Sequence, residues 1–157
     1  MSPAGVLMWV HDAFAIGPNP HGDFCTMVAV ALSQGVDHYT LKIAAGGHPL
    51  PVVVSGGTAR FVGTHGSLLG IVANPHFVED EIDLEPGDWL VLYTDGVTDE
   101  PGPAALDNDE LLALLEETVY GGTDDTAERL ERALLQRCVN VRRDDIALIL
   151  VRYLPVG

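Results

Sequence analysis

Residues 84–100 read Leu-Glu-Pro-Gly-Asp-Trp-Leu-Val-Leu-Tyr-Thr-Asp-Gly-Val-Thr-Asp-Glu. The stretch begins with a turn at Pro86-Gly87-Asp88, because Pro fixes φ and Gly accepts the positive φ of a tight turn. A run of strand-forming residues follows from Trp89 to Thr94, apolar enough to lie inside a sheet. The strand ends at Asp95-Gly96, where a carboxylate carried by a rigid element is well placed to hold a hard cation. The ordinary alternative is that Asp-Gly forms only a turn.

A second acidic stretch lies near the C-terminus, where Arg142-Arg143-Asp144-Asp145 runs directly into strand-forming residues that begin at Ile146. These carboxylates stand at the start of a strand, whereas Asp95 stands at the end of one. If the two strands are antiparallel neighbours, the carboxylates converge, and a divalent ion such as Mg²⁺ or Mn²⁺ would offset their repulsion. The alternative is that the two arginines form exposed ion pairs with Asp144 and Asp145, which contribute little to stability.

The composition fits one soluble domain over residues 1–157. With 8 Lys and Arg against 23 Asp and Glu, the formal net charge is −15. This balance argues against binding to nucleic acid, which needs cationic groups to displace counterions, and against binding to anionic membranes.

The compartment is predicted from the cysteines and the N-terminus. Cys25 and Cys138 both lie in apolar patterns without a partner at metal-ligand spacing, which favours buried free thiols in a reducing cytoplasm. We see no signal peptide and no apolar run of the roughly 20 residues needed to cross a bilayer. The predicted location is the cytoplasm.

Local patterns predict an α+β domain. Short turns join most of the strands, so the sheets should be largely antiparallel, with helices packed on them. A helix is expected from Ser2-Pro3 to Phe14, with Val6, Val10 and Phe14 on its apolar face. Strands are expected at residues 24–32 (a central one), 39–43, 52–54, 58–62, 77–84, 89–94 and 146–153, and two helices begin near residues 107 and 125.

Among the six histidines, only His48 sits in a setting that looks built for it, Gly46-Gly47-His48-Pro49. Glycines there let the backbone approach closely, and a histidine in such a turn more often has a structural role than a catalytic one. No Gly-Lys-Ser/Thr follows the glycine pairs, and no Gly-x-Ser-x-Gly is present, so a phosphate-binding loop and an acyl-transfer serine are not indicated.

Several short motifs together resemble one family. They are Phe24-Cys25-Thr26-Met27, Ala45-Gly46-Gly47-His48-Pro49, Leu69-Gly70-Ile71, Pro86-Gly87-Asp88, Leu92-Tyr93-Thr94-Asp95-Gly96-Val97-Thr98-Asp99 and Asp144-Asp145-Ile146-Ala147-Leu148. In order and spacing they resemble the SpoIIE-type branch of the PPM metal-dependent serine/threonine phosphatases, which includes phosphatases that regulate bacterial alternative sigma factors. The resemblance implies an α-β-β-α sandwich with a dinuclear Mn²⁺ or Mg²⁺ centre, where the metals activate a water that attacks phosphoserine or phosphothreonine.

The resemblance also implies roles for single residues. Asp95 matches one metal-ligating aspartate of the family, and Asp144 matches another, with Asp145 as the second choice. His48 falls in the family's Asn-Ala-Gly-His-Pro-Pro segment, although this chain has Ala45 in place of Asn and Leu50 in place of the second Pro. No catalytic side chain is assigned beyond the two metal ligands.

The family's other two acidic motifs, Gly-Gly-Asp and Asp-Gly-x-Gly-His-Gly, are absent from the sequence. They belong before the helix that starts near Pro3, and Asp23 lies after that point, so no metal role is carried to it. We therefore expect a domain incomplete at its N-terminus, inactive alone and prone to self-association, with a phosphoprotein substrate and an upstream sensor domain as partners. The alternative is a catalytically inactive, phosphatase-like module that binds a regulatory protein.

Overall fold

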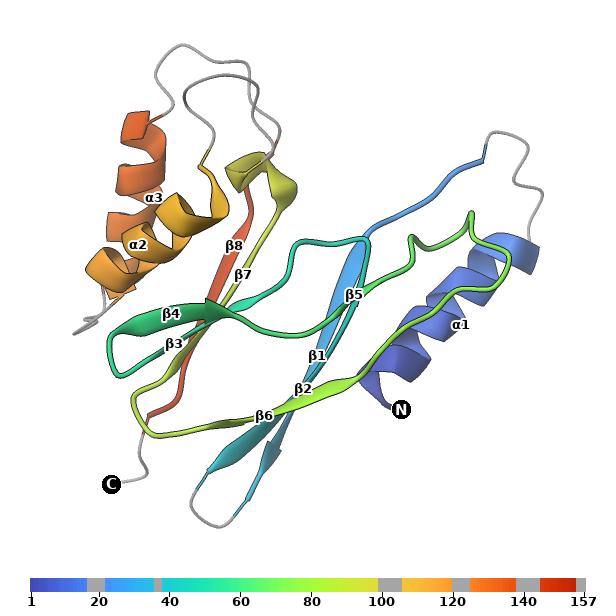
Figure 1. Cartoon of the computed structure of the whole chain (residues 1–157), viewed down its shortest axis with the longest axis horizontal. Coiled ribbons are helices and arrows are strands. Elements are labelled where there is room, and N and C mark those ends of the chain that lie inside the picture. Colours follow the sequence, from blue (N-terminus) through green and yellow to red (C-terminus); the bar gives the residue numbers. More distant parts are fainter. Residues whose placement is uncertain (17–21, 36–37, 99–105, 120–124, 138–144, 155–157) are drawn as a thin grey trace. The chain divides into compact units, whose positions relative to one another are not determined.

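The computed structural model describes residues 1–16, 22–35, 38–98, 106–119, 125–137 and 145–154 (Figure 1). The chain divides into two compact units, of which the first contains Met1–Leu50 and Val62–Glu85, and the second Pro51–Phe61 and Pro86–Gly157. Among the described residues, the first unit combines a mainly antiparallel sheet with one α-helix and the second an antiparallel sheet with two, which confirms the predicted α+β class. The assignment of residues 1–157 to one domain stays a prediction.

The sheet of the first unit is organised around β2 (Tyr39–Gly46). On one side β2 pairs antiparallel with β1 (Met27–Gln34), from Met27↔Gly46 to Gln34↔Tyr39. It also pairs with β6 (Asp80–Leu84) and, in parallel, with the short β5 (His65–Gly66). The prediction of residues 24–32 as a central strand was wrong, because β1 lies at the edge of the described sheet and β2 takes the centre.

Helix α1 (Pro3–Ile16) covers this sheet. Its start is capped as expected, since the Ser2 hydroxyl accepts the Gly5 N–H at 3.2 Å. Leu7 is fully buried and forms a small core with Ala44 and Leu69, against which Val10 packs. After its first residue, the most buried side chains of the helix are therefore Leu7 and His11. Each lies one residue after a position of the predicted apolar face, Val6 and Val10.

The sheet of the second unit has the strand order β4-β3-β7-β8. The strands β3 (Val52–Ser55) and β4 (Thr58–Phe61) form the predicted hairpin, in which Gly56 and Gly57 adopt φ values of 57° and 87°. Strand β7 (Trp89–Tyr93) pairs antiparallel with β3 and with β8 (Leu148–Arg152). The stretch at residues 84–100 thus supplies an inner strand of this sheet.

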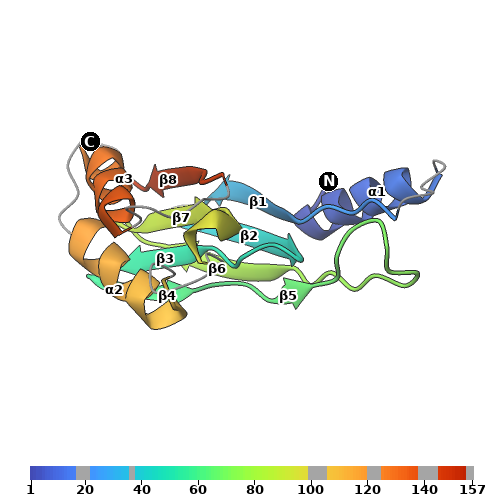
Figure 2. The same cartoon turned by 90° about the horizontal axis from the view of Figure 1, so that it is seen from above.

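Helices α2 (Asn108–Val119) and α3 (Thr126–Arg137) pack on this second sheet, and Figure 2 shows them as neighbours. A reciprocal capping box starts α2, because Asp107 Oδ1 accepts the Glu110 N–H at 2.8 Å and Glu110 Oε2 accepts the Asp107 N–H at 3.1 Å. Arg129 joins the helices by donating to the carbonyl of Thr118 at 2.8 Å. The core between helices and sheet includes Val52, Val91, Tyr93, Leu111, Leu115, Leu130 and Leu134. In the described part of the chain, no helix has the length and apolar character needed to cross a bilayer.

We expect the Cys25 thiol to react slowly with iodoacetamide at neutral pH. Cys25 is a partly buried free thiol, and burial raises its pKa by penalising the charged thiolate, which is the reactive form. The rate should therefore rise only at a pH above that at which an exposed thiol ionises. The experiment is mass spectrometry of alkylation against pH in a Cys138→Ser variant, with the urea-unfolded chain as control. Equal rates in folded and unfolded protein at neutral pH would contradict this prediction.

Candidate metal centre

Asp95 lies at the end of β7, where the strand curls into the 3-10 turn η1 (Asp95–Val97). The turn fixes the backbone on both sides of the residue, because Val97 N–H donates to the Thr94 carbonyl at 3.1 Å and Thr98 N–H donates to the Asp95 carbonyl at 2.8 Å. The Asp95 side chain is exposed, and no hydrogen bond or ion pair joins its carboxylate to another described residue. A backbone held by these bonds, with a carboxylate that no other described residue binds, suits a metal ligand.

The start of the last strand runs beside this turn. Strands β7 and β8 are antiparallel, with Tyr93 opposite Leu148, as the sequence predicts. Beyond this pair, Thr94 N–H donates to the Ala147 carbonyl at 3.1 Å. The Thr94 hydroxyl donates to the Asp145 carbonyl and accepts the Ala147 N–H, both at 2.9 Å. The segment that immediately follows Asp144 in the sequence is therefore bound to the residue that immediately precedes Asp95.

The predicted ligand Asp144 lies outside the described residues, as do Asp99, Arg142 and Arg143. The convergence of the Asp95 and Asp144 carboxylates, and the alternative ion pairs with the two arginines, therefore stay predictions. Within the described residues, no group of three or more His, Cys, Asp and Glu side chains could hold a metal ion.

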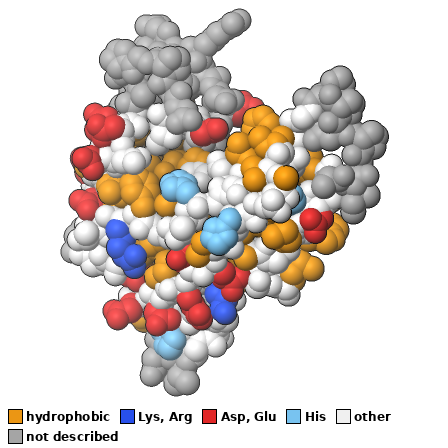
Figure 3. Space-filling model, turned by 45° about the vertical axis from the view of Figure 1, so that its right-hand side comes forward, with side chains coloured by type: hydrophobic (Ala, Val, Ile, Leu, Met, Phe, Trp, Pro, Cys, Tyr) orange, Lys and Arg blue, Asp and Glu red, His pale blue; other side chains and the backbone are white. Residues whose placement is uncertain are grey.

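The donors present fit Mg²⁺ or Mn²⁺ by their chemistry. Asp95 and Asp145 are both exposed, and each offers the hard carboxylate oxygens that these cations prefer. They make up only part of a ligand set. Acidic residues outnumber basic ones in the sequence, and on the face shown in Figure 3 acidic side chains are more widespread than basic ones.

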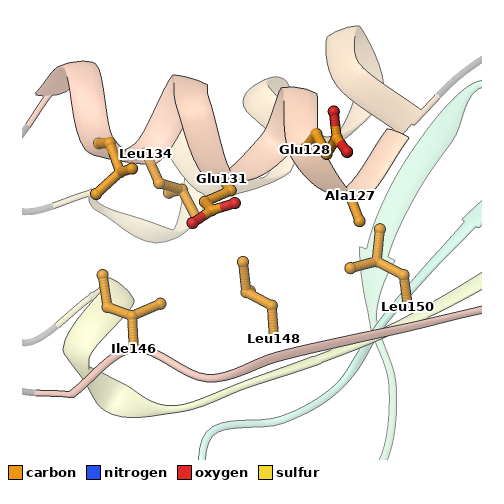
Figure 4. A pocket seen from close by; sticks show the side chains of 8 residues that line it. Ala127, Glu128, Glu131, Leu134, Ile146, Leu148 and Leu150 are labelled. Carbon is orange, nitrogen blue, oxygen red and sulfur yellow. The ribbon is translucent and has the colours of Figure 1, made fainter. Parts of the chain in front are cut away.

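A cavity of about 380 Å³ lies between α3 and β8, and Figure 4 shows Leu148 and Leu150 pointing from β8 toward the helix. Its lining is mainly apolar: Ala127, Leu134, Leu135, Ile146, Leu148 and Leu150, with Glu128 and Glu131 on α3. These lining residues include no cationic side chain and two carboxylates, which would repel a phosphoryl group. The cavity is therefore a poor candidate for the substrate site, although Ile146 directly follows Asp145 in the chain.

Comparison with known proteins identifies the family. The family model described as Stage II sporulation protein E (SpoIIE) matches residues 1–154. The chain belongs to the SpoIIE family. The resemblance that the sequence motifs carry is thereby confirmed, and with it membership of a family of PPM-type phosphatase domains.

Similar proteins place this SpoIIE-family chain among PPM phosphatase folds. Protein IcfG of Synechocystis sp. is 34% identical over 88 residues, a match that covers 53% of this chain and 13% of IcfG. The crystal structure of the RsbU and RsbW domains of a Mycobacterium tuberculosis protein matches with a TM-score of 0.76 at 21% identity, covering all of this chain and 44% of the other. The phosphatase domain of SpoIIE from Bacillus subtilis matches with a TM-score of 0.64 at 13% identity, covering 100% of this chain and 69% of that domain. The predicted PPM phosphatase fold is thus confirmed, and the chain spans less than half the length of the first two of these proteins.

The remaining residues that the SpoIIE resemblance singled out are placed as follows. His48 is half-buried, and its Nδ1 bonds to the carbonyl of Pro49 at 3.0 Å, which agrees with a structural role. Asp23 lies two residues before Cys25, whose backbone forms an isolated antiparallel β-bridge with Leu69. Sequence reasoning missed Thr94, whose hydroxyl joins the two strands beside Asp95. The sequence carries no separate signal for this role, because threonine is common in strands.

Proposed function

We propose that this chain belongs to a protein serine/threonine phosphatase that hydrolyses phosphoserine or phosphothreonine on a bacterial regulatory protein. One observation supports this most directly: the end of β7, which carries Asp95, is hydrogen-bonded to the segment that follows Asp144. This is the strand arrangement that the motif match requires of two metal-ligating aspartates.

The proposed roles of the residues follow from the motif match. Asp95 and Asp144 would hold Mn²⁺ or Mg²⁺, with Asp145 as the second choice for the latter ligand. When bound, such an ion supplies a Lewis acid and an activated water for attack on a phosphoester. The 3-10 turn keeps Asp95 at a fixed position on the end of a strand, so its carboxylate needs little reordering to bind the ion.

The substrate and partners are proposed from the family. SpoIIE is called a cell fate determinant, and the M. tuberculosis structure joins an RsbU domain to an RsbW domain. We place the present chain in a comparable signalling role, acting on a phosphoprotein of a sigma-factor pathway in the cytoplasm, with an upstream sensor domain. The net charge of −15 favours a substrate that presents basic residues near its phosphorylated side chain.

The test adds the two acidic motifs that the sequence lacks. An N-terminal portion that carries Gly-Gly-Asp and Asp-Gly-x-Gly-His-Gly is fused before Met1, and phosphate release from a phosphoserine protein is measured with and without Mn²⁺. We expect turnover that requires Mn²⁺ and stops on addition of EDTA. A correctly folded fusion that releases no phosphate with either Mn²⁺ or Mg²⁺ would contradict the proposed enzyme.

The second candidate is a catalytically inactive, phosphatase-like module that binds a regulatory protein. It is favoured by the absence of the two acidic motifs from the 157 residues. The fusion experiment separates the candidates, because an inactive module would release no phosphate with or without Mn²⁺.

A further inference from the structure

The backbone ladder between β7 and β8 ends at Thr94. Up to Tyr93 the two strands pair through their main chains, and Thr94 N–H adds one further bond to the Ala147 carbonyl. The Thr94 carbonyl, however, accepts Val97 N–H, because the chain curls there into the turn that begins with Asp95. The Ala147 N–H bonds instead to a side chain of the other strand.

The side chain that bonds to the Ala147 N–H is that of Thr94, through its hydroxyl. It accepts the Ala147 N–H at 2.9 Å and donates its own proton to the Asp145 carbonyl, also at 2.9 Å. It does not cap the 3-10 turn that follows it. One hydroxyl thus continues the pairing of the strands for two more residues, past the point where the main chain leaves the ladder.

From this geometry we propose that Thr94 is a positioning residue for the candidate metal centre, an inference that rests on the proposed function. Its hydroxyl holds the backbone at Asp145 against the backbone that leads into Asp95, so the acids at the two strand ends keep a fixed separation. Groups that orient metal ligands without touching the metal commonly change metal affinity by about 10- to 100-fold when removed.

Two features separate positioning from plain stabilisation. Both hydroxyl bonds are solvent-exposed, so water can satisfy the Ala147 N–H and the Asp145 carbonyl when the hydroxyl is absent. Thr94→Val keeps the branched shape of the side chain and removes only these two bonds. The variant should therefore stay folded while the Asp145 segment moves more freely.

The experiment is a Mn²⁺ titration of the full 157-residue chain, followed by electron paramagnetic resonance, with amide exchange at Ala147 as a second readout. We expect Thr94→Val to bind Mn²⁺ about 10-fold more weakly and to exchange the Ala147 amide faster. Thr94→Ser, which keeps the hydroxyl, should restore both values. Thr40→Val is the matched control, because Thr40 also donates a side-chain bond to a neighbouring strand, to Asp83, but in the other sheet.

The outcomes distinguish the two proposals. If Asp95→Asn weakens Mn²⁺ binding and Thr94→Val does not, the positioning role is overturned while the metal site stands. If Thr94→Ser is as impaired as Thr94→Val, the hydroxyl is not the responsible group. If Asp95→Asn binds Mn²⁺ as tightly as the wild type, the proposed metal site itself fails, and the positioning role fails with it.

Discussion

Asp95→Asn, made in an intact domain that carries all the acidic motifs of the family, is expected to abolish Mn²⁺-dependent phosphatase activity and to leave the fold in place. The substitution keeps the size and shape of the side chain but removes the negative charge that offsets the cation. The 3-10 turn should survive, because its bonds from Val97 and Thr98 use the main-chain carbonyls of Thr94 and Asp95. The measurement is phosphate release at several Mn²⁺ concentrations, with circular dichroism as the check on folding.

The matched control is Asp109→Asn, which makes the same chemical change at an exposed acid in the first turn of α2. It should keep full activity. In the metal-free protein, Asp95→Asn should be at least as stable as the wild type, because it relieves repulsion between carboxylates at the two strand ends. Retention of most Mn²⁺-dependent activity by Asp95→Asn would show that Asp95 is not a ligand.

Much of the fold could be predicted because short-range chemistry decides it. The Gly56-Gly57 turn and the strand after Pro86-Gly87-Asp88 each follow from local residue preferences. The order of strands in a sheet depends instead on contacts between distant segments. The apolar character of residues 24–32 indicated a buried central strand, but β1 is an edge strand that α1 covers only in part: its first four residues are half-buried and its last four are exposed.

Likewise, only part of the candidate site could be predicted from the sequence. A carboxylate at the end of one strand and two at the start of another are visible in the sequence, so Asp95, Asp144 and Asp145 could be named. The role of Thr94 could not, because it depends on the chain turning away from the ladder at one residue, which frees the Ala147 N–H to meet a hydroxyl. Threonine is common in strands for its shape alone, so its presence there carries no separate signal.

The 157-residue chain alone is expected to lack efficient phosphatase activity. Two or three carboxylates can bind one divalent ion weakly, but a two-metal centre needs ligands that fix the metal spacing and orient the water. In the family, these come partly from Gly-Gly-Asp and Asp-Gly-x-Gly-His-Gly, which this sequence does not contain. The assay is phosphate release from a phosphoserine protein by the purified chain, with the fused protein as the positive control. Efficient metal-dependent turnover by the chain alone would mean that its own acids, Asp23 or Asp99 among them, complete the centre.

The same isolated chain is expected to self-associate. In the described sheet β8 is the last strand, and Ile149 on it is 60% exposed, while Leu32 on the edge strand β1 of the other sheet is 45% exposed. Edge strands with exposed apolar side chains pair readily with other chains. The net charge of −15 opposes association between copies, so raising the salt concentration should promote it by screening that repulsion. Light scattering of the chain at low and high salt measures the effect, and the fused protein should remain monomeric under both conditions if its added strands cover these edges.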